Sequence, residues 1–368
     1  MFKIDLSDYK ESSIHFNLFD TLIVGLEEGK EKYLRSLGIN PSTYRKCRKG
    51  DLKIGHDIIV FLANHYSLTI LKNEEYDELS KMFTSIYDKL YYKIEFSYDE
   101  DLKLIEDMIE KNYIIHPVIK LMKLFVVMCS NKTRESIISE NIDLYNEIKI
   151  YKQCYNNSLI QIYEIVSLFY EENIEEGKGL KNYKNGFIYY ILATRAYSDK
   201  KYIESIFYAM KAKEILDADG NVLRNLHVNN ILMSSFLYVG NYEECNELAN
   251  KQLLTIRSIG LGQGFHRRSA SKYLFVSLLG LDRCEEIIEL CEVKKMFNLT
   301  ELTCYLVAMF RLDKNMYEAY FDGLDLNVFN EKDKKYLITI NEYLRTNHRK
   351  VLKDLTDYDV MGCLINII

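Results

Sequence analysis

The chain has 368 residues, 48% of them hydrophobic and 28% charged, which is typical of a globular protein with a substantial core. It contains only 2 prolines and 16 glycines, too few turn-forming residues for a sandwich, a barrel or a doubly wound sheet. The composition therefore predicts an all-α protein. The net charge of −6 is mild, but it is distributed unevenly along the chain.

The sequence lacks signals for export, membrane insertion and metal binding. Residues 1–10 contain no apolar stretch of signal-peptide length, and the longest apolar run, 124–129, is far short of the roughly 20 residues that span a membrane. The eight cysteines include no C-x-x-C pair, and no cysteine–histidine group has zinc-site spacing. We expect a cytoplasmic protein with reduced, mostly buried cysteines, no bound metal and no membrane partner.

Positive charge is concentrated near the amino terminus. Residues 30–53 hold eight basic and two acidic side chains, a net charge of +6, so the rest of the chain carries −12. This asymmetry favours a small basic head with a polyanionic partner, carried on an acidic body. The alternative interpretation is a solvated helix face.

The basic region has the pattern of two short helices joined by a tight turn. Residues 30–38 have helical periodicity and end in a glycine. Asn40 is a suitable helix cap and Pro41 suits a first helical position, so a second helix is predicted over 42–49. A third apolar-periodic segment, 54–66, can pack behind both.

Such a pair of helices is typical of the helix-turn-helix motif, whose second helix enters the major groove of DNA. Its hydroxyl groups and cations can bind phosphates, and an arginine can make two hydrogen bonds to a guanine edge. The candidate DNA-binding residues are Ser42, Thr43, Arg45, Lys46, Arg48 and Lys49. Tyr44 and Cys47 are expected to face inward.

Residues 38–50 (GINPSTYRKCRKG) resemble the core of the helix-turn-helix domain of phage repressors and related bacterial regulators, and the resemblance extends from about Phe19 to Leu68. It implies a DNA-binding domain over 1–72. The chain departs from that family in two places. Arg48 stands where the family often has an acid, and residues 19–29, which should form the first helix of the domain, have a less regular helical pattern. A degenerate head that no longer reads DNA is the alternative.

Residues 73–368 are predicted to be helical, and three fragments within them align. Each has a small residue where two helices of a hairpin approach closely, and a leucine 13 residues before it. The small residues are Ser205, Cys245 and Ala319, and the leucines are Leu192, Leu232 and Leu306. The pattern resembles the tetratricopeptide repeat, which implies a right-handed helical superhelix. A further repeat is expected within 271–292, and an irregular helical bundle is the alternative.

In such a superhelix the first helix of each hairpin lines a concave surface where extended peptides bind. An asparagine there can donate to and accept from a peptide backbone, and a tyrosine offers an apolar surface with a polar tip. The candidate peptide-binding residues are Tyr190, Thr194, Tyr197, Asn225, His227, Asn230, Ser234 and Arg311. Phe187 and Cys304 fall in the same register.

Enzyme signatures are missing from the sequence. It contains no P-loop, nucleophile elbow, H-E-x-x-H or Rossmann fingerprint. The glycine-rich stretch 260–264 (GLGQG) is compatible with anion binding, but no strand precedes it, so a loop between repeats is the favoured interpretation. We expect neither an enzyme nor a cofactor.

In order and length the whole chain resembles the peptide-pheromone-sensing regulators of Gram-positive bacteria and their phages, and residues 224–245 look most like the arbitrium receptors of phages. The resemblance implies a homodimeric regulator whose affinity for a double-stranded DNA operator changes when a short signalling peptide binds. Asn225, by its place in this motif, and Asn230, by its concave register, are the expected peptide contacts. The alternative is a helical-repeat interaction module with a degenerate head, which binds a partner protein rather than DNA.

The last nine residues, 360–368 (VMGCLINII), are too apolar for a solvated tail. They are expected to pack into the final hairpin or across a two-fold dimer interface.

Overall fold

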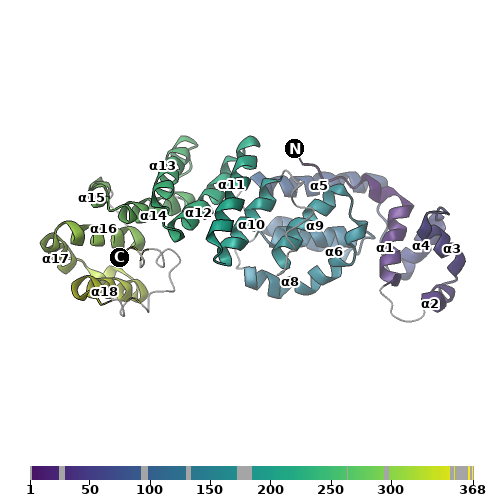
Figure 1. Ribbon diagram of the computed structural model, residues 1–368. Helices are drawn as coiled ribbons and strands as arrows, with labels where there is room; N and C mark the ends of the chain where they lie inside the picture. The colour runs from purple at the N-terminus through teal and green to yellow at the C-terminus, as the bar shows by residue number, and fades with distance from the viewer. Residues whose placement is uncertain are drawn as a thin grey trace. The chain divides into compact units, whose positions relative to one another are not determined.

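The computed structural model describes residues 2–24, 30–92, 98–129, 134–171, 185–262, 264–293 and 298–348, together with Leu352, Leu364 and Ile367. Within these residues the regular elements are eighteen α-helices and short 3-10 turns, and none is a strand (Figure 1). An isolated bridge joins Thr69 and Tyr113. The predicted all-α class is confirmed.

The chain divides into two compact units, Met1–Tyr183 and Lys184–Ile368, and the predicted boundary between 72 and 73 lies inside the first. No helix in the described part of the chain has the length and apolarity needed to span a membrane. The seven described cysteines form no disulfide, and five of them are buried.

In its described residues, the first unit contains nine α-helices. Its elements are η1 (Ser7–Lys10), α1 (Ser12–Val24), α2 (Lys30–Ser36), α3 (Pro41–Lys49), α4 (His56–His65), α5 (Asn73–Tyr92), α6 (Asp99–Glu110), α7 (His116–Val127), α8 (Arg134–Lys149), η2 (Lys152–Cys154) and α9 (Asn157–Tyr170). Helix α7 is its centre, because nine of its twelve residues are buried and it packs against α5, α6, α8 and α9. The Tyr87 ring on α5 stacks on Phe125 of α7, with ring centroids 5.7 Å apart.

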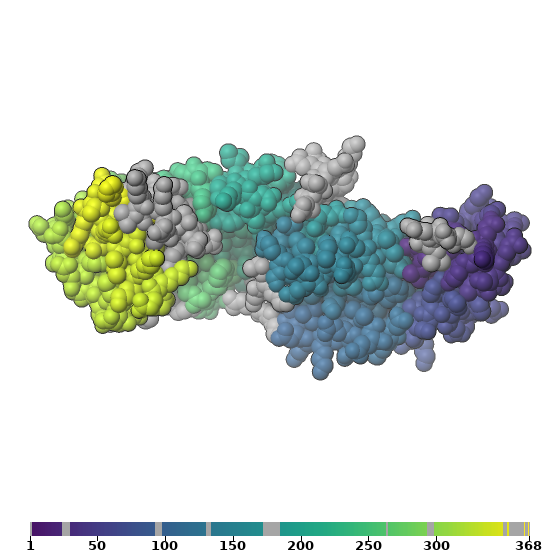
Figure 2. Space-filling view, turned by 90° about the horizontal axis from the view of Figure 1, so that it is seen from below, coloured from purple at the N-terminus to yellow at the C-terminus, as the bar shows by residue number. Residues whose placement is uncertain are grey.

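The extended residues before η1 attach the head to the rest of the first unit. The Leu6 amide donates to Ser80 Oγ on α5 at 3.0 Å, and the Tyr9 hydroxyl donates to the Cys154 carbonyl at 2.7 Å. Ile4, Leu6 and Tyr9 are almost fully buried. The purple head therefore adjoins the blue helices of the same unit (Figure 2).

The second unit consists of helices that pack against their chain neighbours. Its elements are α10 (Gly186–Ser198), α11 (Tyr202–Ala218), α12 (Val222–Tyr238), α13 (Tyr242–Ser258), α14 (Phe265–Gly280), α15 (Cys284–Val293), α16 (Leu299–Leu312), α17 (Lys314–Asp322), η4 (Leu326–Val328) and α18 (Glu331–Thr346). Consecutive helices from α10 to α17 are in contact, and α10, α12, α14 and α16 also contact one another in series. The even-numbered helices thus form one layer.

The helices α10 to α14 end in the same way. The second residue beyond each of them has a positive φ, which turns the chain into the next helix. These residues are Lys200, Gly220, Gly240, Gly260 and Asp282. Glycine adopts this conformation without steric cost, whereas Lys200 and Asp282 hold it as ordinary residues.

The structure fixes the register of the helix pairs. The fourth residue of each second helix is fully buried, and in α11 the Ser205 hydroxyl donates to the Ala193 carbonyl at 2.9 Å. The equivalent positions are Ser205, Cys245, Ile287 and Tyr317. Leu274 precedes Ile287 by the same 13 residues as in the aligned pairs, so the expected further repeat corresponds to α14 and α15.

Ala319 does not occupy the position that the sequence alignment gave it, because it is exposed. Three residues separate the two helices in the earlier pairs, but only Asp313 separates α16 from α17. This shorter connection moves the register by two residues, so Tyr317 packs where Ala319 was expected. Leu306 itself is fully buried.

Candidate functional site

The head contains the predicted pair of short helices, α2 and α3. The side chain of Asn40 accepts a hydrogen bond from the Ser42 amide, and Pro41 occupies the first turn, so the predicted start of α3 is confirmed. The connection and the end of α3 both use glycine at positive φ, 73° at Gly38 and 78° at Gly50. Helix α4 follows at 56–65, close to the third predicted segment.

Helix α3 exposes its basic face and buries its aromatic residue. Tyr44 is 3% exposed and packs edge-on against Phe16 of α1, whereas Cys47 is only half-buried. Thr43 is also half-buried. The exposed candidate residues are Ser42, Arg45, Lys46, Arg48 and Lys49. Five of the six predicted DNA contacts therefore lie on one accessible helix surface.

A buried carboxylate on α1 anchors this helix. Asp20 is 7% exposed and accepts a hydrogen bond from the Tyr44 hydroxyl. Its other oxygen lies 3.2 Å from Nε of Arg48, and Lys30 Nζ lies 3.7 Å from the oxygen that Tyr44 uses. Burial, followed by the hydrogen bond to Asp20, raises the pKa of Tyr44 well above its ordinary value. Asp20 of α1 thus contacts both the buried aromatic residue and one of the exposed arginines of α3.

A second acid lies beside the same surface. Arg45 forms an ion pair with Glu31 of α2, and both side chains are more than half exposed. Lys46 and Lys49 have no acidic partner among the described residues. The surface therefore offers two unpaired cations and two arginines that are already paired.

In the second unit, the candidate residues on α10 and α12 come together. The Tyr190 ring lies edge-on to His227, with centroids 6.5 Å apart, and the Tyr197 and Ser234 hydroxyls are 2.7 Å apart. Thr194 is exposed, and its hydroxyl donates to the Tyr190 carbonyl. These contacts group the predicted residues on the layer of first helices.

Arg311 does not join this group. Its guanidinium lies on α16, 3.0 Å from an Asp282 carboxylate oxygen, and donates to the backbone carbonyls of Leu279 and Ile367. Phe187 and Cys304, expected in the same concave register, are fully buried. Arg311 therefore supports the carboxy-terminal part of the unit in this structure.

Amide side chains from α12 and α13 form a buried network with α14. Gln252 Nε2 donates to Asn230 Oδ1 at 2.8 Å, and Asn230 Nδ2 lies 3.3 Å from His266 Nδ1. Asn225 Nδ2 donates to Asp217 at 2.6 Å. These four side chains, Asn225, Asn230, Gln252 and His266, are each at least nine-tenths buried. Asn230 thus holds two neighbouring helices together.

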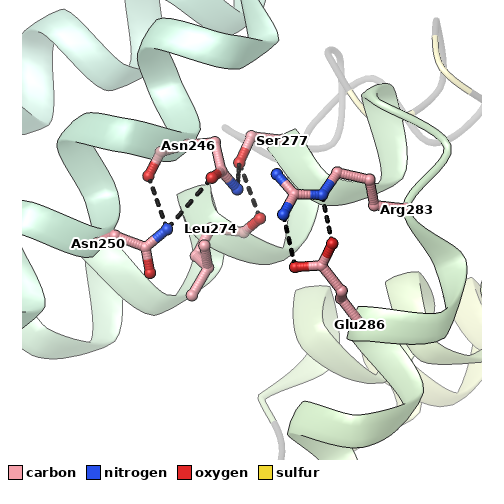
Figure 3. Close-up of polar contacts among 6 residues, drawn as sticks. All are labelled: Asn246, Asn250, Leu274, Ser277, Arg283 and Glu286. Carbon is pink, nitrogen blue, oxygen red and sulfur yellow. Dashed lines mark hydrogen bonds and ion pairs between the residues drawn. The ribbon is translucent and has the colours of Figure 1, made fainter.

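The amide groups of Asn246 and Asn250 on α13 find their hydrogen-bond partners within the chain. Asn246 Nδ2 lies 3.3 Å from Ser277 Oγ, which donates in turn to the Leu274 carbonyl (Figure 3). Asn250 Nδ2 donates to the backbone and side-chain oxygens of Asn246 (Figure 3). Arg283 and Glu286 form an ion pair at the start of α15 in the same view. The Asn246 amide therefore links α13 to α14, and Asn250 supports it from the next turn of α13.

Four buried polar atoms on α12 and α13 differ from these, because no described residue hydrogen-bonds to them. They are Asn225 Oδ1, His227 Nε2, Asn229 Oδ1 and Gln252 Oε1. A buried polar atom without a partner costs about 1–3 kcal/mol, and native proteins contain few of them. The four atoms are three amide oxygens and one ring nitrogen on the adjacent helices α12 and α13.

Of these four groups, the His227 ring lies beside other aromatic rings and near one cation. The Arg224 guanidinium lies 4.7 Å from the Phe187 ring centroid and 5.2 Å from that of Tyr190. The His227 ring packs between Tyr190 and Phe265. Burial, followed by the charges of His266 and Arg224, lowers the pKa of His227 to about 2, so this imidazole is neutral at physiological pH.

Several residues around His227 and Asn230 were not predicted from the sequence as candidate ligand contacts. They are Arg224, Asn229, Gln252, Phe265 and His266. Asn225 and Asn229 are four residues apart on α12, so a helical count of polar residues would have detected Asn229. Gln252 and His266 have no such signal, because tertiary packing brings α13 and α14 to α12.

The described residues contain no group of three or more histidine, cysteine, aspartate or glutamate side chains that could hold a metal ion. Comparisons of the chain with protein-family models, with curated proteins and with solved structures found no match.

Proposed function

We propose that the chain is a DNA-binding regulator whose affinity for its operator is switched by a short peptide bound in the second unit. The proposal depends chiefly on the four unpartnered buried atoms of α12 and α13. Amide groups can pair with a peptide backbone whatever its sequence, and neighbouring aromatic rings can accept its side chains. The exposed basic face of α3 supports the DNA-binding half of the proposal.

We further infer that the helix pairs from α10 to α17 form a tetratricopeptide-like right-handed superhelix. Three observations support this inference: the series of contacts among the first helices, the shared turn geometry after α10 to α14, and the common buried position in each second helix. In that architecture the first helix of each pair lines the concave surface. The grouped residues of α10 and α12, which are Tyr190, Tyr197, His227 and Ser234, would then lie on that surface.

Peptide binding is tested by calorimetry on the full-length protein. The probes are synthetic peptides of five to ten residues, encoded immediately downstream of the chain's own gene. Asn229→Ala removes an unpartnered oxygen and breaks no hydrogen bond among the described residues. If that oxygen accepts a hydrogen bond from the peptide, the substitution should raise the dissociation constant of the peptide about tenfold or more. Thr255→Ala on α13 is the control, because that hydroxyl only bonds to its own helix.

DNA binding is tested by fluorescence anisotropy on the gene's own upstream DNA at two salt concentrations. Arg45→Ala with Lys46→Ala should weaken binding and reduce the salt slope by roughly one for each lost phosphate contact. Lys314→Ala with Lys335→Ala, two exposed lysines of the second unit, is the matched control. Unchanged operator affinity in the head variant would contradict the assignment of α3.

The two halves of the proposal are linked by reciprocity. If the peptide changes DNA affinity, DNA must change peptide affinity by the same factor, and a coupling of about 1–3 kcal/mol is typical.

The second candidate is a protein-interaction module with an inert head. The pairing of Arg45 with Glu31 and of Arg48 with Asp20 favours it, because two of the four candidate cations are already neutralised. Binding to DNA that is weak, salt-sensitive and without sequence preference, together with no binding of any of the peptides, would select this candidate.

A further inference from the structure

The charges of the second unit are divided between its two sets of helices. We call α10, α12, α14 and α16 (labelled in Figure 1) the first-helix layer, and α11, α13, α15 and α17 the second helices. The first-helix layer carries six basic residues and one acidic residue, a net charge of +5. The second helices carry five basic and twelve acidic residues, a net charge of −7. The two sets therefore have opposite charge, although they alternate along the chain.

The two charged residues of α16 are used within the unit. Glu301 is 1% exposed and completes the capping box of α16. Arg311 donates to the backbone carbonyl of Ile367 in the carboxy-terminal segment. In that segment Leu364 is fully buried and Ile367 packs against the same core, whereas the other residues of 360–368 lie outside the described part of the chain. The charge that the layer presents to a ligand therefore comes from the other three helices.

Helices α10, α12 and α14 contain five basic residues and no acidic residue. Helix α12 contacts both of the other two, so these helices are neighbours within the layer. The basic residues are Arg195, Arg224, Arg267, Arg268 and Lys272. A surface with charges of one sign attracts ligands of the opposite sign and raises their local concentration.

Three of these cations lie close to the ring contact between α12 and α14. The Phe265 ring of α14 packs against the His227 ring of α12, with centroids 6.1 Å apart. Phe265, Arg268 and Lys272 are spaced by three and four residues, which places them on one side of α14. Arg224 precedes His227 by one turn of α12, and its charge contributes to the lowered pKa of His227. The cations thus lie within one or two helical turns of the paired rings.

We propose that the first-helix layer binds an acidic peptide, whose carboxylates contact Arg224, Arg268 and Lys272. This inference rests on the proposed function and adds to it the charge of the ligand. A carboxylate forms a charge-assisted hydrogen bond with a guanidinium or an ammonium group, which is stronger than a bond between neutral groups. The same cations repel a basic peptide, so the layer selects its ligand by charge as well as by shape.

The buried acceptors of α12 and α13 favour a peptide over a nucleic acid, which is also an anion. Asn225, Asn229 and Gln252 each have an amide oxygen to which no described residue hydrogen-bonds. A peptide backbone carries N–H donors along its length, whereas the sugar–phosphate backbone of DNA carries none. An acidic peptide can therefore pair with both the cations and the amide oxygens.

A mixture of synthetic peptides tests the charge of the ligand without knowledge of its sequence. Peptides of about eight residues, randomised at every position, are incubated with the immobilised full-length protein, and the retained fraction is sequenced by mass spectrometry. We expect aspartate and glutamate to be enriched about fivefold or more over lysine and arginine, since an ion pair contributes up to about 1 kcal/mol.

The outcomes of this selection separate the present inference from the proposed function. Peptides that are retained without a charge bias, or with a bias toward lysine and arginine, would overturn the inference and leave peptide binding intact. Retention of no peptide would overturn both. The most enriched acidic peptide then becomes the probe for calorimetry.

Arg268→Gln with Lys272→Gln, the α14 variant, removes two cations from the side of α14 that carries Phe265. We expect it to raise the dissociation constant of the acidic probe about fivefold or more. Lys251→Gln with Arg257→Gln is the matched control, because it removes one lysine and one arginine from exposed positions of α13. Circular dichroism verifies that both variants keep their helices. Equal affinity of the α14 variant and the wild type would overturn the proposal.

Two changes in the probe identify the carboxylate that is bound. Amidation removes only the carboxy-terminal carboxylate, and exchange of aspartate and glutamate for asparagine and glutamine removes those of the side chains. At least one change should weaken binding to the wild type, and it should weaken binding to the α14 variant less, because partner cations are already missing there. Equal losses in both proteins would place the carboxylates elsewhere and overturn the proposal.

A nucleic acid on the first-helix layer is the competing outcome. Duplex DNA without an operator sequence is titrated by fluorescence anisotropy against the wild type and the α14 variant. We expect the same affinity for both. Weaker DNA binding by the α14 variant, together with no enrichment of acidic peptides, would assign the layer to nucleic acid and overturn the proposal.

Discussion

Nε of Arg48 on α3 lies 3.2 Å from a carboxylate oxygen of Asp20 on α1, and the same carboxylate accepts the Tyr44 hydroxyl. One buried acid therefore fixes the basic helix through both a neutral and a charged partner. Because Asp20 is 7% exposed while Arg48 remains half in solvent, the carboxylate can position the arginine without removing it from the surface.

Asp20→Ala should destabilise the first unit by about 1–3 kcal/mol, because it leaves the Tyr44 hydroxyl buried without its acceptor. Urea unfolding followed by circular dichroism measures the change. Glu31→Ala is the control, since it removes the exposed partner of Arg45 and should cost less than about 1 kcal/mol. Equal losses in the two variants would contradict the anchoring role of Asp20.

Glu31→Gln should strengthen DNA binding if α3 contacts DNA. The substitution removes a negative charge beside the phosphates and releases Arg45 from its ion pair. We expect a several-fold tighter complex and a steeper salt dependence, both measured by fluorescence anisotropy. Glu331→Gln, at the exposed start of α18, is the control and should leave both unchanged.

Gly280→Ala should destabilise the second unit by about 1–3 kcal/mol, because a Cβ at Gly280 would lie 2.6 Å from ring carbons of Tyr242. Urea unfolding provides the measurement, and Gly262→Ala, whose Cβ would meet no atom within 4 Å, is the control. Combining Gly280→Ala with Tyr242→Leu should cost less than the two changes added together. If the losses of unfolding free energy in the two single variants simply add in the double variant, the Gly280 Cβ does not clash with the Tyr242 ring.

His116 should make stability depend on pH. Burial and the Lys120 ammonium lower the pKa of His116 to about 4, against an opposing effect of Glu147. Between that value and the ordinary pKa of about 6.5, the unfolded chain binds a proton that the folded chain does not, so stability falls as pH falls through this window. From pH 7 to pH 5 the loss attributable to His116 is about 2 kcal/mol.

Urea unfolding of the wild type and of His116→Gln at both pH values isolates this contribution, because other acidic and basic groups affect both proteins alike. The variant should lose about 2 kcal/mol less than the wild type over the interval. The same loss in both proteins would show that folding does not lower the pKa of His116.

Local sequence determined the helices and their ends. The start of α3 follows from Asn40 and Pro41, and its end follows from Gly50, because caps depend on residues within one turn. The 13-residue offset from Leu192 to Ser205 and from Leu232 to Cys245 likewise marks real helix pairs. The offset fails at Ala319, because the length of the connection between α16 and α17 sets the register and the aligned residues do not reveal that length.

Tertiary packing alone decided which polar groups are buried together. The sequence placed Tyr190, Asn225, His227 and Asn230 on the first helices of their pairs, where the structure has them. It gave no sign that Gln252 and His266 would meet Asn230, that Asp20 would meet Arg48, or that Arg311 would turn to the carboxy terminus. Capping and periodicity act within a few residues, whereas burial and the pairing of buried charges depend on contacts between residues far apart in the chain.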